Sequence, residues 1–142
     1  MRQYWQRKPL LIRAALPGFA AAIDRSRLFE LARDPQAESR LIAAFGRRRS
    51  LKHGPFLRLP STKRAGWTLL VQGVDLLDDS ARSLLSRFRF VPDARLDDLM
   101  VSFATDGGGV GAHIDSYDVF LLQTSGRRRW RISRQRNLRA KP

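Results

Sequence analysis

The sequence contains no cysteine and only two histidines among its 142 residues. Without cysteine the chain can form neither a disulfide framework nor a thiolate metal site, which fits the reducing cytoplasm, where we expect the protein to be located. No apolar run approaches the roughly 18 residues that span a membrane, so no membrane association is expected. Hydrophobic residues make up 43% of the chain, a proportion typical of a folded domain with a packed core.

Acidic residues are scarce: 13 stand against 27 basic ones, and the formal net charge is +14. Residues 47–64 include seven Lys or Arg and residues 127–141 include eight, and neither run contains an acid. Such a positive field attracts RNA. Solvated basic faces in an arginine-rich proteome would give the same composition, so both interpretations stay open. The basic residues are not interleaved with aromatic ones, so sequence-specific base reading is not indicated.

The order of apolar, turn and capping residues predicts a mainly β chain with a few helices. We expect the end of a helix at 3–8, a helix at 24–33 with Asp24 as its N-cap, and a helix at 79–88 with an apolar stripe in the core. We expect strands at 9–13, 39–45, 67–74, 96–103, 112–123 and 127–132, and a basic turn at 46–52. The last three strands would form an antiparallel meander at the front of a jelly roll.

An H-x-D triplet, His113, Ile114 and Asp115, is the first candidate site. In an extended strand, side chains two residues apart point to the same face, so the imidazole and the carboxylate could reach one cation. These are two of the three ligands of a 2-His-1-carboxylate triad, which holds non-haem Fe(II) with open positions. The triplet also occurs by chance, and His113 could instead be a hydrogen-bonded strand residue.

Arg128 is the second candidate, fifteen residues after the histidine. In the predicted strand 127–132, alternation places Arg128 on one face with Trp130 and Ile132. A guanidinium on an apolar inner face is costly unless it meets an anion, and its planar fork suits a carboxylate. A dicarboxylate could therefore chelate the metal at one end and meet Arg128 at the other. The alternative is an edge strand whose arginines all extend into solvent.

The glycines at 107–109 and 111 form neither a phosphate-binding loop nor a dinucleotide fingerprint, because a predicted strand follows them rather than a helix. Glycine permits close approach of the backbone, so we expect this segment to let backbone and substrate come close to the metal.

Several motifs, in order along nearly the whole chain, resemble the JmjC-type cupin ribosomal oxygenases, and the bacterial branch above all. They are YWQRKPL at 4–10, KHGPF at 52–56, WTLLVQ at 67–72, DDLMVSF at 97–103, GGGVGAHIDSYDVF at 107–120 and GRRRWRI at 126–132. The resemblance implies an α+β, mainly β fold: the N-terminal part of a cupin/JmjC double-stranded β-helix, or jelly roll, with flanking helices. Residues 1–95 would be an N-terminal α/β portion packing on the barrel, and residues 96–142 the first strands of the JmjC domain.

The resemblance further implies an oxygenase dependent on Fe(II) and 2-oxoglutarate that hydroxylates an arginine of a large-subunit ribosomal protein. His113 and Asp115 would be metal ligands, and Arg128 would bind the 2-oxoglutarate carboxylate. It also implies a homodimer, and the basic surface adds association with the ribosome or its RNA.

The match to the family has one departure. The family's third ligand is a histidine several tens of residues after the triplet, and no histidine follows His113 here. The sequence therefore predicts an incomplete barrel, and a fragment with poor stability and little activity alone unless a second chain supplies the rest. The alternative function is a catalytically inactive basic module, derived from a cupin, that binds RNA or the ribosome. A cupin that binds sugars has no support beyond fold class.

Overall fold

The computed structural model describes residues 3–45 and 48–133. The chain divides into two compact units, one made of residues 22–111 and the other of residues 1–21 and 112–142. We expected a domain boundary near residue 95. The two compact units do not test that boundary, which stays a prediction. None of the helices in the described ranges is both long enough and apolar enough to cross a membrane.

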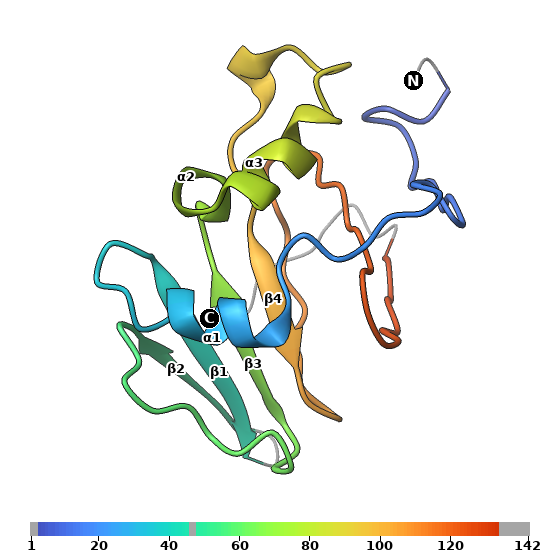
Figure 1. Cartoon of the computed structure of the whole chain (residues 1–142). Helices are drawn as coiled ribbons and strands as arrows, with labels where there is room; N and C mark the ends of the chain where they lie inside the picture. Colours follow the sequence, from blue (N-terminus) through green and yellow to red (C-terminus); the bar gives the residue numbers. More distant parts are fainter. Residues whose placement is uncertain (1–2, 46–47, 134–142) are drawn as a thin grey trace. The chain divides into compact units, whose positions relative to one another are not determined.

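A four-stranded antiparallel sheet forms the centre of the unit 22–111 (Figure 1). Its strands are β1 (Ser39–Phe45), β2 (Arg48–His53), β3 (Trp67–Val71) and β4 (Val101–Ala104), in the order β2-β1-β3-β4. In the register, Leu41 of β1 pairs with Lys52 and Leu69, and Leu69 pairs with Phe103 of β4. The antiparallel sheet and its few helices confirm the predicted mainly β class.

Strand β1 has the predicted bounds, but two other strands are shorter than predicted. β3 stops at Val71 because Gly73 takes a left-handed conformation (φ 63°) and α2 (Val74–Leu77) begins directly after it. β4 starts only at Val101, because the chain before it contacts α2: Leu99 accepts a hydrogen bond from Val74 N and donates one to Asp75 Oδ1.

The basic turn predicted at 46–52 is wrong, because β2 occupies most of it. β2 is exposed at five of its six residues, so it lacks the alternation of apolar and polar residues by which strands are recognised. It forms a strand because β1 supplies its hydrogen bonds in an antiparallel pair. Charged side chains suit such an edge strand, since they discourage pairing with another chain.

Two helices begin where the sequence predicts, and an aspartate caps each of them. Asp24 caps α1 (Arg25–Leu31), and its Oδ1 accepts a hydrogen bond from Arg27 N at 2.8 Å. Asp78 caps α3 (Asp79–Ser86) by accepting from the N–H groups of Ser80 and Ala81. The predicted packing of the α3 stripe is confirmed at Ala81 and Leu84, which are buried. A short 3-10 helix, η1 (Asp93–Arg95), follows α3.

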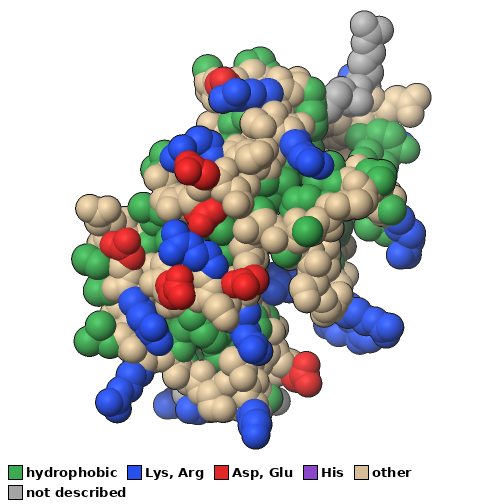
Figure 2. Space-filling model, viewed as in Figure 1, with side chains coloured by type: hydrophobic (Ala, Val, Ile, Leu, Met, Phe, Trp, Pro, Cys, Tyr) green, Lys and Arg blue, Asp and Glu red, His purple; other side chains and the backbone are tan. Residues whose placement is uncertain are grey.

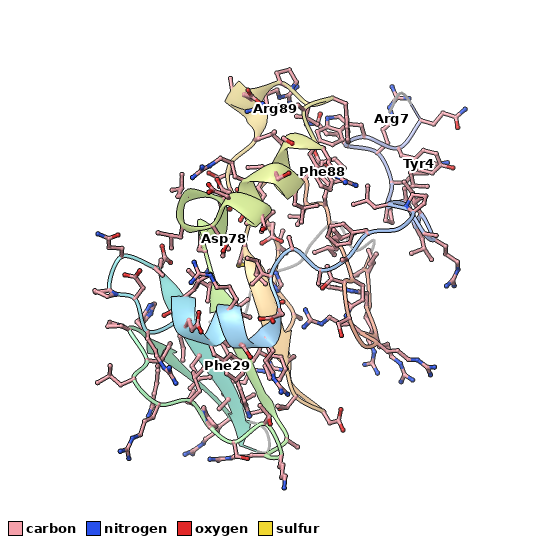
Figure 3. The ribbon with its side chains drawn as sticks, viewed as in Figure 1. Tyr4, Arg7, Phe29, Asp78, Phe88 and Arg89 are labelled. Atoms are coloured by element: carbon pink, nitrogen blue, oxygen red, sulfur yellow. The ribbon has the colours of Figure 1, made fainter. Side chains whose placement is uncertain are left out.

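Three aromatic rings pack between α1 and the sheet. Figure 3 labels Phe29, which lies on the side of α1 that faces the strands. Its ring centroid is 6.2 Å from that of Trp67 on β3 and 5.3 Å from that of Phe103 on β4, and the Trp67 and Phe103 centroids are 5.3 Å apart. Trp67 is 1% exposed, and its Nε1 donates to the Ser61 carbonyl at 3.1 Å. This cluster joins the helix to two strands.

The other unit contains neither a helix nor a strand among its described residues, 3–21 and 112–133. The expected helix end at 3–8 is a turn in which Arg7 and Lys8 donate to the Tyr4 carbonyl. The strands predicted at 9–13, 112–123 and 127–132 do not form. Most of the apolar residues that would line their inner faces are exposed: Leu121 is 59% and Ile132 68% exposed. A strand is stable only when a neighbour completes its hydrogen bonds and covers one face.

Candidate metal and co-substrate site

The structure brings the two residues of the H-x-D motif together. His113 Nε2 and Asp115 Oδ2 lie 3.5 Å apart, and the side chains are 50% and 39% exposed. They approach each other on a surface segment and not on the predicted strand, since residues 113–115 have no regular secondary structure. The contact is an ion pair only when the imidazole is protonated.

The spacing of these two donors fits a shared metal ion. Two ligands that each lie about 2.1 Å from a metal, at an angle near 90°, are about 3 Å apart, so a small rotation of either side chain would suffice. An imidazole nitrogen and a carboxylate oxygen are also the donor types of a non-haem iron site. Among the described residues, however, no group of three or more His, Cys, Asp or Glu gathers around one point. His113 and Asp115 therefore supply part of a ligand set.

Arg128 is exposed, and its guanidinium carbon lies 5.9 Å from the centroid of the Trp130 ring. The two side chains are thus neighbours, as alternation in an extended segment predicts, and the contact is within the range of a cation–π interaction. The apolar inner face that would bury the arginine is absent from the described residues, because strand 127–132 does not form there. Its role toward 2-oxoglutarate stays a prediction.

The segment that leads to His113 is fixed to the sheet by its backbone. Gly108 N donates to the Thr105 carbonyl at 2.8 Å, and Thr105 N donates to the Trp67 carbonyl at 3.1 Å. A Cβ on Gly108 would overlap the carbonyl oxygens of both Trp67 and Thr105. The expected close approach of glycine is therefore present, but it is made to β3, whereas we expected it toward the metal.

Gly111 makes a second close approach, two residues before the histidine. Its φ is +89°, and a Cβ there would overlap the guanidinium of Arg49, which extends from β2. Neither contact could be found from the sequence, because both depend on how β2, β3 and the segment after β4 are brought together. The only signal in the sequence is the density of glycine at 107–111.

Asp98 and Asp75 hold the chain before β4 in place. Asp98 Oδ2 accepts from Gly73 N at 2.7 Å, and Asp75 Oδ1 accepts from Leu99 N at 2.8 Å. The sequence indicates that Asp97 and Asp98 are a poor acid/base pair, since neighbours in an extended chain point to opposite faces. Asp98 instead binds a backbone N–H that the sheet leaves unpaired.

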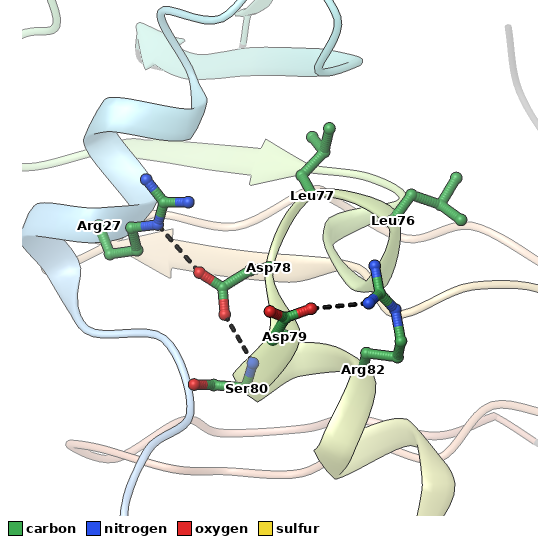
Figure 4. A pocket seen from close by; sticks show the side chains of 7 residues that line it. All are labelled: Arg27, Leu76, Leu77, Asp78, Asp79, Ser80 and Arg82. Carbon is green, nitrogen blue, oxygen red and sulfur yellow. Dashed lines mark hydrogen bonds and ion pairs between the residues drawn. The ribbon is translucent and has the colours of Figure 1, made fainter.

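A shallow depression of about 330 Å³ lies beside α1, α2 and α3, and its polar side chains pair with one another (Figure 4). Arg27 Nε contacts Asp78 Oδ2 at 3.0 Å, and Arg82 contacts Asp79 at 2.6 Å. Partial burial raises the pKa of Asp78, but hydrogen bonds from Arg27 and from the Ala81 and Ser80 backbone outweigh it, so the pKa lies below its ordinary value. These paired charges indicate a structural role.

We expect Asp78 to make stability dependent on pH. Because its pKa is lower in the folded chain than in the unfolded one, its charge stabilises the fold fully above about pH 4, and this contribution is lost as the pH falls through the folded pKa. Asp78→Asn keeps a capping oxygen and removes the charge, so urea unfolding should separate it from wild type at pH 6 and bring the two together in acid. Asp78→Ala should cost about 1 kcal/mol even in acid, because the cap itself is lost, and more at pH 6, where the charge is lost as well. A gap between Asn and wild type that does not change with pH would contradict this assignment.

Comparison with known proteins identifies the relatives of the chain. Residues 83–142 match the family model of the JmjC domain. The chain is 39% identical over 132 residues to the ribosomal protein uL16 3-hydroxylase of Escherichia coli, a match that covers 93% of this chain and 35% of the relative. It is 36% identical over 140 residues to a probable ribosomal oxygenase of Haemophilus influenzae, covering 94% of this chain and 34% of the relative. Over most of its own length the chain is similar in sequence to bacterial ribosomal oxygenases.

The fold of the chain is similar to that of a ribosomal oxygenase whose structure is known. YcfD, a ribosomal oxygenase from Escherichia coli, matches with a TM-score of 0.76 and 35% identity over 80% of this chain and 32% of YcfD. YcfD in complex with cobalt and 2-oxoglutarate matches with a TM-score of 0.74 and 34% identity over 78% of this chain and 30% of that one. The predicted resemblance to the JmjC ribosomal oxygenases and their cupin fold is thereby confirmed. The chain spans about a third of the length of the relatives it matches.

Proposed function

We propose that this chain is part of an Fe(II)- and 2-oxoglutarate-dependent oxygenase that hydroxylates an arginine of a large-subunit ribosomal protein. The observation that carries the proposal is the His113–Asp115 pair, whose donor atoms lie 3.5 Å apart within the segment that matches the JmjC domain. The relatives support it by name, since one is a ribosomal protein hydroxylase and a solved ribosomal oxygenase holds cobalt with 2-oxoglutarate.

In this proposal His113 Nε2 and Asp115 Oδ2 hold the iron, and Arg128 meets the distal carboxylate of 2-oxoglutarate. When bound, the iron would let molecular oxygen oxidise both the arginine and 2-oxoglutarate, with one oxygen atom going to each. The residues of this chain supply orientation. Hydrogen bonds from Thr105 to β3 and from Gly108 to Thr105 fix the chain that leads to both ligands. Arg128 provides a fork that binds a carboxylate in one orientation.

The third metal ligand would come from outside the described residues, which bring together only His113 and Asp115. A continuation of the same protein or a second chain could supply it. The homodimer and the cytoplasmic location that the family resemblance and composition imply belong to the same proposal. For the protein in its longest natural form, iron content tests the ligand set, mass in solution tests the homodimer, and cell fractionation tests the location.

The ligand assignment is tested by cobalt binding, followed by absorption spectroscopy. We expect His113→Ala and Asp115→Asn each to weaken Co(II) binding by about tenfold or more, as for the loss of a metal ligand or its support. Asp118→Asn is the matched control, because Asp118 is an exposed carboxylate three residues away and its substitution removes the same charge. The affinity of Asp118→Asn for Co(II) should equal that of the wild type. Equal affinity of all three variants and the wild type would overturn the assignment.

Hydroxylation itself is tested with a large-subunit ribosomal protein as substrate, by mass spectrometry of the arginine-containing peptides. We expect a gain of one oxygen that requires both Fe(II) and 2-oxoglutarate and is lost in His113→Ala. Modification that continues without 2-oxoglutarate would overturn the proposed co-substrate, whatever the outcome of the cobalt titration.

A further inference from the structure

A strip of exposed basic side chains follows one edge of the sheet. It consists of Arg48, Arg49 and Lys52 on β2 and Arg58, Lys63 and Arg64 on the loop that joins β2 to β3. β2 is the edge strand of the sheet, so no further strand of this sheet flanks it. Figure 2 shows Lys and Arg side chains projecting along the lower margin of this unit, where β2 and the loop lie in Figure 1.

Acidic side chains are kept away from most of this basic strip. The sequence contains no acid between residues 47 and 64. Several acids of the unit 22–111 form salt bridges with other arginines, namely Arg27, Arg40, Arg82 and Arg89. In Figure 2 most of the Asp and Glu side chains lie above the strip, over the helices. The strip therefore keeps its positive potential, which favours an extended anion.

The geometry favours a regular row of phosphates. Arg48 and Lys52 are four residues apart on a strand, so they share a face and are about 13 Å apart along it. Arg49 lies on the opposite face, and the loop residues extend the row beyond the strand. Four of the six side chains are arginines, whose planar forks donate two hydrogen bonds to one phosphate.

The aromatic residues next to the strip argue against single-stranded nucleic acid. Proteins that hold unpaired bases stack them on exposed aromatic rings. Here Phe56 is 9% exposed and Trp67 only 1%, and both belong to the core. A surface with guanidinium groups and no stacking platform suits the backbone of a double helix, which is recognised by its shape and its phosphates.

We propose that the basic strip on β2 and the β2–β3 loop docks the phosphate backbone of double-helical RNA. Binding is independent of base sequence and depends strongly on salt, because each phosphate that is neutralised releases counterions. The inference does not rest on the proposed metal site, since it uses other residues and no cofactor. The basic strip would account for part of the excess positive charge of the chain.

The test measures the affinity of the full chain for a short RNA duplex of mixed sequence, by fluorescence anisotropy at several salt concentrations. The strip variant replaces Arg48, Lys52, Arg58 and Lys63 by Gln. Arg49 is retained because its guanidinium contacts Gly111. We expect this variant to lose about tenfold or more in affinity, and the slope of log affinity against log salt to become shallower by roughly two to four.

The control variant replaces Arg25, Arg33, Arg87 and Arg95 by Gln. These arginines are also exposed, and they lie in or beside α1, α3 and η1. Both variants lower the formal net charge from +14 by four, to +10. We expect the control to keep most of its affinity. Equal losses in the two variants would overturn the proposal, because binding would then follow total charge and not this strip.

Two further measurements keep the test decisive if the strip variant folds poorly. In the wild-type chain, NMR titration with the duplex should shift the backbone amides of 48–53 and 57–64 more than those of α3. Polyuridylate and vesicles of phosphatidylserine and phosphatidylcholine serve as competing partners. Shifts centred elsewhere, or a preference for polyuridylate or for the vesicles over the duplex, would overturn the proposal.

Discussion

Replacing Trp67 by alanine should lower the free energy of unfolding by about 3–5 kcal/mol, as for the loss of a large aromatic side chain from a core. Trp67 is 1% exposed and contacts Phe29 of α1 and Phe103 of β4. Its removal leaves a cavity where helix and sheet meet and leaves the Ser61 carbonyl without its hydrogen bond from Nε1. Because domains are stabilised by only about 5–15 kcal/mol in total, a loss of this size could abolish folding.

Urea unfolding followed by circular dichroism measures this loss, since the fluorescence of Trp67 is absent from the variant. Trp67→Phe should cost less than alanine, because part of the ring packing is kept, although the Nε1 hydrogen bond and the rest of the indole packing are lost. Trp130→Ala is the control: Trp130 is 48% exposed, so we expect a change within about 0.5 kcal/mol. If Trp67→Ala cost no more than this control, the aromatic cluster would not be what joins α1 to the sheet. The same curves show whether the 142 residues unfold cooperatively, which tests the expected poor stability of the isolated chain.

The parts of the fold that the sequence predicts well are those fixed by local chemistry. Asp24 identifies the start of α1 because an aspartate caps the helix through its own side chain, and β1 is an apolar run between turn residues. β2 could not be predicted, because its residues are polar on both faces and only the hydrogen bonds from β1 make it a strand. Strand pairing depends on two segments, so the sequence of one segment alone does not predict it.

Residues 112–132 show the opposite error. The apolar run at 117–123 and the alternation at 127–132 predict two strands, but none is present there, and Phe120 and Leu121 are 44% and 59% exposed. An alternating pattern states which side chains would share a face if a partner strand were present, and it does not supply the partner. The proximity of His113 and Asp115 was nevertheless predicted, because it requires only the spacing of two residues.

Replacing Gly108 by alanine should destabilise the packing of the glycine segment 107–111 on β3. The added methyl group would overlap the carbonyl oxygens of Trp67 and Thr105 and lie 3.0 Å from Thr68 Oγ1. Both carbonyls belong to backbone that is tied by the Thr105–Trp67 hydrogen bond, so neither can move aside without breaking it. We expect a loss of about 1–3 kcal/mol in urea unfolding, the usual cost of overpacking. If the proposed metal site is correct, Co(II) binding should weaken as well, because His113 and Asp115 would follow a backbone that is displaced at Gly108.

Neighbouring glycines separate this steric effect from a general effect of alanine. A Cβ on Gly109 would meet nothing within 4 Å, so Gly109→Ala should leave both stability and Co(II) affinity nearly unchanged. Gly107 also has open space around it but has a φ of +70°, so Gly107→Ala should cost about 1 kcal/mol from backbone strain alone. The expected order of destabilisation is therefore Gly108, then Gly107, then Gly109. A Gly108 variant as stable as the Gly109 variant would show that the segment is not packed on β3, whereas a destabilised Gly108 variant with unchanged Co(II) affinity would show that this packing does not position His113 and Asp115.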